Sequence, residues 1–77
     1  MSDKTRLNWA ETRDLLIENG VNPDLLPTEW HPGIDLRGVQ LMGAQLQGVF
    51  LRAVDLRGAN MIGSDLSYAD FSYAVLV

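Results

Sequence analysis

The stretch that decides the fold is VDLRGANMIGSDLSYADFSYAVL, residues 54–76. Cut every five residues, it reads VDLRG, ANMIG, SDLSY, ADFSY and AVL, with a small or β-branched residue first and a large apolar residue third. A helix repeats about every 3.6 residues and a strand every two, so a period of five fits neither. The pattern therefore predicts another kind of regular structure.

The same period of five runs back along the chain to residue 34. The residue before each large apolar centre is usually Asp, Asn or Gln, and Gly usually stands two positions after the centre. Ala53, Tyr68 and Tyr73 stand where Gly is otherwise found. The centres are Leu36, Leu41, Leu46, Leu51, Leu56, Met61, Leu66, Phe71 and Leu76.

Two inward and three outward side chains in every five residues describe a chain that turns a corner in each repeat. Four corners close a square, so about twenty residues form one coil, and coils stack at roughly the 4.8 Å strand spacing. We expect the Gly and Asx residues at the corners to adopt positive φ angles.

The pieces VDLRG, SDLSY and ADFSY resemble the pentapeptide-repeat consensus A-(D/N)-L-x-x, and the resemblance covers residues 34–77. It implies a mainly β fold, a right-handed quadrilateral parallel β-helix of about two coils. It implies no catalytic residues, because the family shares none. Members of the family include DNA-mimicking gyrase inhibitors, cyanobacterial proteins and secreted bacterial effectors.

Residues 1–33 differ in composition and are expected to form an N-terminal helical segment in one compact domain with residues 34–77. Asn8 and Glu11 have capping-box spacing, which predicts a helix from Trp9 to Asn19. Gly20 is suited to the helix end, and Asn22-Pro23 predicts a further short helical turn. His31-Pro32-Gly33 is a turn signal.

The helical segment is predicted to cap the first coil through Trp9, Leu15 and Leu16. The alternative is that it packs along one wall of the coil, over Met42 and Ile62. Either arrangement would bury its apolar face.

Composition limits the functional classes. The chain has no Cys, and its start has neither the basic segment nor the apolar run of a signal peptide. No window approaches the length of a membrane span, so we expect a cytoplasmic protein that does not bind membranes. The net charge of −4 argues against direct nucleic-acid binding.

No catalytic, cofactor-binding or metal site is predicted. His31 is the only His and is interpreted as a turn residue. Ser64, Ser67 and Ser72 have no His on their faces to act as a base. The stacked Asp35 and Asp55 each have a neighbouring Arg, and we expect diagonal Asp–Arg pairs between the coils to offset their repulsion. We therefore predict that the protein is not an enzyme.

Outward apolar residues suggest binding surfaces. Met42, Phe50 and Ile62 are predicted to face a protein partner, although isolated exposed apolar residues are also normal. At the C-terminal coil an open backbone edge favours pairing with another copy, the alternative being a frayed end. The residues predicted for this homodimer contact are Tyr68, Phe71, Tyr73, Val75, Leu76 and Val77.

The sequence thus favours a non-catalytic binding or scaffold module with an unidentified protein partner. The alternative is a DNA-mimicking inhibitor of an enzyme such as gyrase. Mimicry requires a long acidic rod, whereas residues 34–77 carry four Asp and three Arg and make a stack roughly 10 Å high. A shortened family member that functions within a larger assembly is a further possibility.

Overall fold

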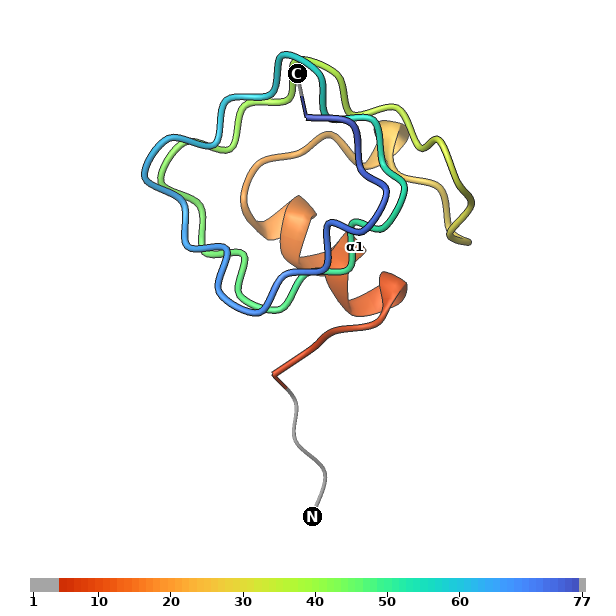
Figure 1. Ribbon diagram of the computed structural model, residues 1–77, viewed down its shortest axis with the longest axis horizontal. Helices are drawn as coiled ribbons and strands as arrows, with labels where there is room; N and C mark the ends of the chain where they lie inside the picture. Colours follow the sequence, from red (N-terminus) through yellow and green to blue (C-terminus); the bar gives the residue numbers. More distant parts are fainter. Residues whose placement is uncertain (1–4, 77) are drawn as a thin grey trace.

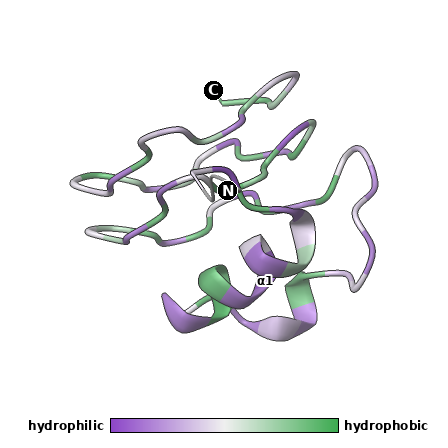
Figure 2. Ribbon diagram, turned by 90° about the horizontal axis from the view of Figure 1, so that it is seen from below, coloured by the Kyte–Doolittle hydropathy of each residue, from purple (hydrophilic) through white to green (hydrophobic). Residues whose placement is uncertain are grey.

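The computed structural model describes residues 5–76, and Figure 1 shows their path. Helix α1 (Trp9–Glu18) is followed by a 3₁₀ turn, η1 (Pro23–Leu25), and then by a chain that winds in stacked coils from residue 34. The helix lies at one end of the stack and the C-terminal residues lie at the other (Figure 2).

The predicted capping box of α1 is confirmed. The Asn8 side chain accepts a hydrogen bond from the Glu11 N–H at 2.8 Å, and the Glu11 carboxylate accepts one from the Asn8 N–H at 3.0 Å. The helix ends one residue earlier than expected, with Asn19 as its C-cap. Gly20 has a φ of +98°, and the N–H of Val21 then reaches the carbonyl of Leu16 at 3.0 Å. This closes the helix as the sequence predicts.

Parallel β-bridges join residues that are twenty positions apart. We call the four bridged columns the walls: Asp35, Asp55 and Val75 form the first, and the others are Gln40–Asn60, Gln45–Asp65 and Phe50–Asp70. Within the described residues these are single bridges and not continuous strands. Each repeat contributes one bridge because its other residues form the corner. The repeats thus build a β-helical stack.

The inward positions of the repeat form the core. Leu36, Leu41, Leu46, Leu51 and Leu56 are each at most 2% exposed. Smaller residues two positions earlier, such as Val49 and Val54, are buried beside them. The alternation of large and small residues predicted from the period is confirmed, and it lets the walls approach the central side chains closely.

The corner after each centre requires a left-handed backbone. Glycines such as Gly38 have φ near +70° there, and Ala53, Tyr68 and Tyr73 adopt 58°, 64° and 63° at the same repeat position. The corner geometry is therefore kept where the sequence departs from Gly. A side chain at such a φ is strained, because its Cβ crowds the following carbonyl oxygen.

The expectation that Asx residues also take positive φ was wrong. Among the described residues, the non-glycine positive φ angles belong to Ala and Tyr only. The Asx side chains instead accept a hydrogen bond from the N–H two residues later: Asp55 from Arg57 at 3.2 Å, and Asp65 from Ser67 at 3.0 Å. Asx turns of this kind explain why Asp and Asn suit this position.

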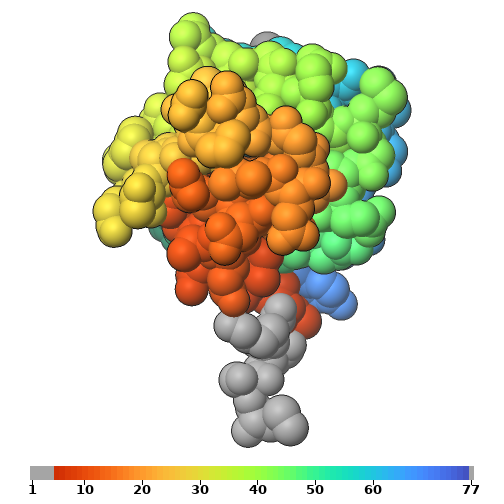
Figure 3. Space-filling view, turned by 180° about the vertical axis from the view of Figure 1, so that it is seen from behind, coloured from red at the N-terminus to blue at the C-terminus, as the bar shows by residue number. Residues whose placement is uncertain are grey.

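Side chains of α1 bond to the backbone of the first coil at its N-terminal end. Thr12, which is fully buried, accepts a hydrogen bond from the N–H of Phe50 at 2.7 Å. Asn19 accepts from the N–H of Gln45 at 3.3 Å and donates to its carbonyl at 3.4 Å. Figure 3 shows the helical segment covering part of this end. Trp9 and Leu16 are buried in the same core, and Leu15 is half-buried against it.

Candidate functional site

At the C-terminal end of the stack, several backbone groups have no partner within residues 5–76. In the first coil, the N–H of Leu46 donates to Asp65 at 2.9 Å, and the carbonyl of Ala44 accepts from Asp65 at 2.9 Å. The corresponding groups one coil later are unpaired within residues 5–76. We call this row the open edge. It comprises the N–H groups of Met61, Gly63, Leu66, Tyr68, Phe71 and Tyr73 and the carbonyls of Ala59, Ser64 and Ala69.

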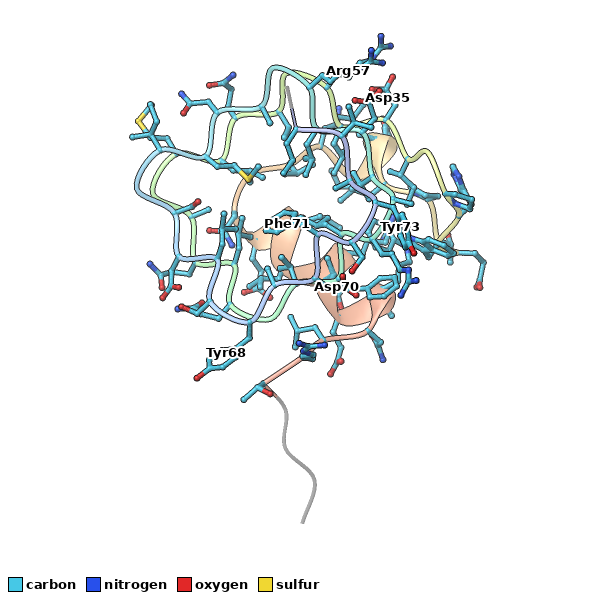
Figure 4. The ribbon with its side chains drawn as sticks, viewed as in Figure 1. Asp35, Arg57, Tyr68, Asp70, Phe71 and Tyr73 are labelled. Carbon is cyan, nitrogen blue, oxygen red and sulfur yellow. The ribbon has the colours of Figure 1, made fainter. Side chains whose placement is uncertain are left out.

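The core is also less covered at this end. Met61, Leu66 and Phe71 occupy the same inward positions as the buried Leu41, Leu46 and Leu51, but each is only half-buried. Figure 4 shows the Phe71 ring inside the outline of the last described coil. Apolar surface of this kind gains free energy when a partner removes it from water.

Most of the predicted self-association residues lie in this last described coil and are exposed. Tyr68 is 65% exposed, Tyr73 is 79% exposed, and Leu76 is 56% exposed. Val75 bridges to Asp55 and is 43% exposed, whereas Val77 lies outside the described residues. These side chains lie on the same coil as the open edge.

The three residues predicted as a partner surface do not form one surface. Met42 and Ile62 occupy matching positions in successive coils and are 64% and 73% exposed. Phe50 lies on the fourth wall and is half-buried, because the Trp30 ring packs edge-on against it with 5.7 Å between ring centroids. The sequence period placed Phe50 outward but contained no signal that the segment before residue 34 would cover it.

Trp30 and Arg52 also make contacts that the sequence did not predict. The Trp30 indole N–H donates to the carbonyl of Arg52 at 2.8 Å. The Arg52 guanidinium lies 5.2 Å from the centroid of the Tyr73 ring. The cation–π contact links Arg52 of the first coil to Tyr73 of the last described coil, and the Trp30 hydrogen bond links the segment before the repeats to the first coil.

The charged residues of the first wall form hydrogen-bonded ion pairs within each coil, and the expected diagonal attraction between coils is present as a weaker coulombic effect of Arg57 on Asp35 and of Arg37 on Asp55. The Arg37 guanidinium bonds to Asp35 at 2.9 Å, and the Arg57 guanidinium bonds to Asp55 at 2.7 Å. The Arg37 side chain lowers the pKa of Asp35 to about 2, and the Arg57 side chain lowers the pKa of Asp55. All four groups point away from the core, and Figure 4 shows Asp35 and Arg57 on the outside of the first wall.

On the third and fourth walls, serines have the corresponding role. Hydrogen bonds from Ser67 lower the pKa of Asp65, and those from Ser72 lower the pKa of Asp70. The Ser67 hydroxyl lies 2.6 Å from the Asp65 carboxylate. The carboxylates and hydroxyls of the repeats are therefore engaged in holding the corners.

Acid should destabilise the fold through these four carboxylates. Their folded pKa values lie below the value of about 3.9 for unfolded Asp, so their contribution is complete above about pH 5, where unfolded Asp is ionised as well. It is lost as pH falls through the folded values, which for Asp35 means near pH 2. We expect the melting temperature, followed by circular dichroism, to decrease between pH 5 and pH 2.

A variant with Asn at positions 35, 55, 65 and 70 is the control, because the Asn side chain retains the oxygen that accepts the turn hydrogen bond. Its melting temperature should depend less on pH over this range. Equal pH dependence in the two proteins would contradict the role assigned to the carboxylates.

The part of the chain that the structure describes contains no cluster of His, Cys, Asp or Glu that could hold a metal ion, and it encloses no pocket. In residues 5–76, no helix has the length and apolar character needed to cross a membrane. The Nδ1 atom of His31 lies 3.0 Å from the carbonyl of Pro32, on the exposed turn before the repeats.

A chain that winds in stacked coils and contributes one short repeat to each corner is a solenoid repeat protein. Comparison with family models matches Pentapeptide repeats, in 8 copies, over residues 31–58 and 51–77. The match covers more than half of the chain, and the chain belongs to the pentapeptide-repeat family. This confirms the resemblance seen in the sequence. No curated protein and no solved structure matches the chain significantly.

Proposed function

We propose that this protein is a non-catalytic binding module that self-associates end to end through its C-terminal coil. The observation that carries the proposal is the open edge, where unpaired backbone groups surround half-buried core residues. Unpaired edges of this kind favour pairing with another chain. The occupant is a second copy of the protein.

The open edge is suited to pairing with itself. It presents donors and acceptors in one row, for example the N–H of Leu66 and Phe71 beside the carbonyls of Ser64 and Ala69. A two-fold axis places donors of one copy opposite acceptors of the other. The inward side chains, including Phe71, would meet across the axis and be removed from water.

The opposite end of the stack explains why the contact would join like ends. There the backbone N–H groups of Gln45 and Phe50 already donate to the side-chain oxygens of Asn19 and Thr12, respectively. One coil later, the equivalent N–H groups of Asp65 and Asp70 donate to the carbonyls of Ala44 and Val49. A coil before the first one would engage the N–H groups of Gln45 and Phe50 in the same way. The helical segment thus acts as a cap on this end and favours a closed dimer over an open filament.

We further infer that the coils form a right-handed quadrilateral β-helix. Bridges at five-residue intervals and a coil of twenty residues support four walls. The family, generally non-catalytic, supports the assignment as a binding module. We propose that the protein acts in the bacterial cytoplasm. Met42 and Ile62, adjacent on successive coils, are the surface that we propose for an unidentified protein partner.

The alternative role, a DNA-mimicking inhibitor of an enzyme such as gyrase, is less well supported by the charge distribution. Such a role needs a dense negative face. On the first wall the Arg37 and Arg57 guanidinium groups neutralise Asp35 and Asp55. The charge on the surface of this wall therefore alternates between negative and positive, whereas mimicry would require a uniformly negative surface.

Replacing Leu76 with Asp should convert the dimer to a monomer. Leu76 is 56% exposed, so the single chain should tolerate a carboxylate, whereas a two-fold contact would bring two such charges together in an apolar interface. Light scattering after gel filtration should give twice the 8.5 kDa chain mass for the parent and the single mass for the variant.

Leu25→Asp is the matched control, because Leu25 is 51% exposed on η1, away from the open edge. It should remain dimeric. Phe71→Asp tests the same interface from the half-buried position. A parent that stays monomeric at high micromolar concentration would overturn the proposal, and so would folded Leu76 and Phe71 variants that both stay dimeric.

A further inference from the structure

We propose that Tyr68 and Tyr73 are specificity residues that recognise the second copy. Their rings are held at the open edge at the expense of the stability of the single chain. This inference rests on the self-association proposed above. It concerns why two tyrosines stand at positions where the repeat uses Gly at every other described corner except Ala53.

The backbone opposes Tyr at both corners. Tyr68 has a φ of 64° and Tyr73 a φ of 63°, in the region where a Cβ crowds the following carbonyl oxygen. Gly58 and Gly63, the two preceding corners of the same coil, have φ angles of 74° and 72° without that penalty. A side chain retained under strain requires a compensating interaction.

Contacts within the chain supply little of the interaction energy that would compensate for this backbone strain. Tyr68 is 65% exposed, and its side chain makes no hydrogen bond, ion pair or ring contact with the rest of residues 5–76. Tyr73 is 79% exposed and has one such contact, with the Arg52 guanidinium. An exposed cation–π contact is weak in water, so neither ring is explained by the single chain.

Their placement points to the open edge. Tyr68 and Tyr73 stand at successive corners on either side of Asp70 and Phe71, and Figure 4 shows both rings pointing outward from the coil that carries the Phe71 ring. Their own N–H groups are unpaired members of the open edge. A copy that paired with this edge would lie beside both rings, and amphipathic Tyr rings contribute strongly to such contacts.

Ala53 provides the internal control for backbone strain. It occupies the same corner as Tyr73 one coil earlier, with a φ of 58°. Its N–H already donates to Ser72 at 2.8 Å, so it lies inside the stack and away from the open edge. Replacing Ala53 with Gly relieves the same kind of strain without touching the proposed interface.

Tyr68→Gly should change folding and association in opposite directions. In a Leu76→Asp monomeric background, relief of the strained φ should raise the melting temperature by a few degrees. With Leu76 intact, the dimer dissociation constant measured by analytical ultracentrifugation should increase at least about tenfold. Ala53→Gly should also raise the melting temperature but leave the dissociation constant within about twofold.

A Tyr68→Gly variant that dimerises as tightly as the parent would overturn this inference and leave the end-to-end dimer intact. A lower melting temperature in the monomeric background would also overturn it, since the ring would then stabilise the single chain. A monomeric parent would instead overturn the proposed self-association itself. Tyr73→Gly should weaken the dimer too, with a smaller gain in melting temperature because the Arg52 contact is lost.

Discussion

Gly48→Ala should destabilise the protein by about 3 kcal/mol, because it combines a strained backbone with an overlap in a packed site. Gly48 is buried and has a φ of +77°. A Cβ at this position would overlap the carbonyl oxygen of Thr5 and lie 3.3 Å from the Cα of Arg6. The chain before α1 crosses the first coil here, where the N–H of Leu7 donates to Gly48 at 2.9 Å.

Gly43→Ala is the matched control. Gly43 has a φ of +68°, and a Cβ there would meet no atom within 4 Å. It should therefore cost only the backbone strain, about 1 kcal/mol. Urea denaturation would measure the unfolding free energies of the two variants. The difference between them gives the cost of disturbing the chain crossing at Gly48. Equal unfolding free energies would show that this crossing does not contribute to the stability of the fold.

Leu51→Ala should have an effect of similar size, with a loss of about 3 kcal/mol of unfolding free energy. Leu51 is 0% exposed at the centre of the first coil, and truncation of a buried Leu removes apolar burial and leaves a cavity. For a domain of this size the total stability is only about 4–12 kcal/mol. A substantial fraction of the variant should therefore be unfolded at moderate urea concentrations.

Leu66→Ala tests the same residue type at the open end. Leu66 is half-buried, so in the monomeric Leu76→Asp background its truncation should cost less than half as much as Leu51→Ala. In the dimer, the loss of unfolding free energy for Leu66→Ala should approach the loss for Leu51→Ala, because the partner would cover Leu66. Equal losses in the monomeric background would contradict the exposure of the core at this end.

Much of the fold could be predicted from the sequence because its determinants are local. The period of five predicted the buried centres, from Leu36 to Leu56, and the capping box predicted where α1 begins. Such patterns depend on residues a few positions apart. The role of the Asx side chains was missed although it is equally local, because Asp and Asn suit both a left-handed corner and a turn hydrogen bond.

The contacts of the helical segment could not be predicted, because they join residues far apart in the chain. Nothing in the pattern around Thr12 indicates that its hydroxyl would accept from Phe50, 38 residues later. The packing of Trp30 on Phe50 has the same origin. These contacts depend on the direction in which the segment leaves the first coil.

The sequence by itself determined that the chain turns a corner every five residues and which side chains point inward, since steric and apolar requirements recur identically in each repeat. The sequence also predicted that the two ends of the stack differ, but only the tertiary structure decided which contacts cover the N-terminal end. At one end, side chains of α1 bond to the backbone of Gln45 and Phe50; at the other, Leu66 and Phe71 remain partly exposed within residues 5–76. A repeat specifies how one coil stacks on the next, whereas the covering of an end depends on contacts from outside the repeat.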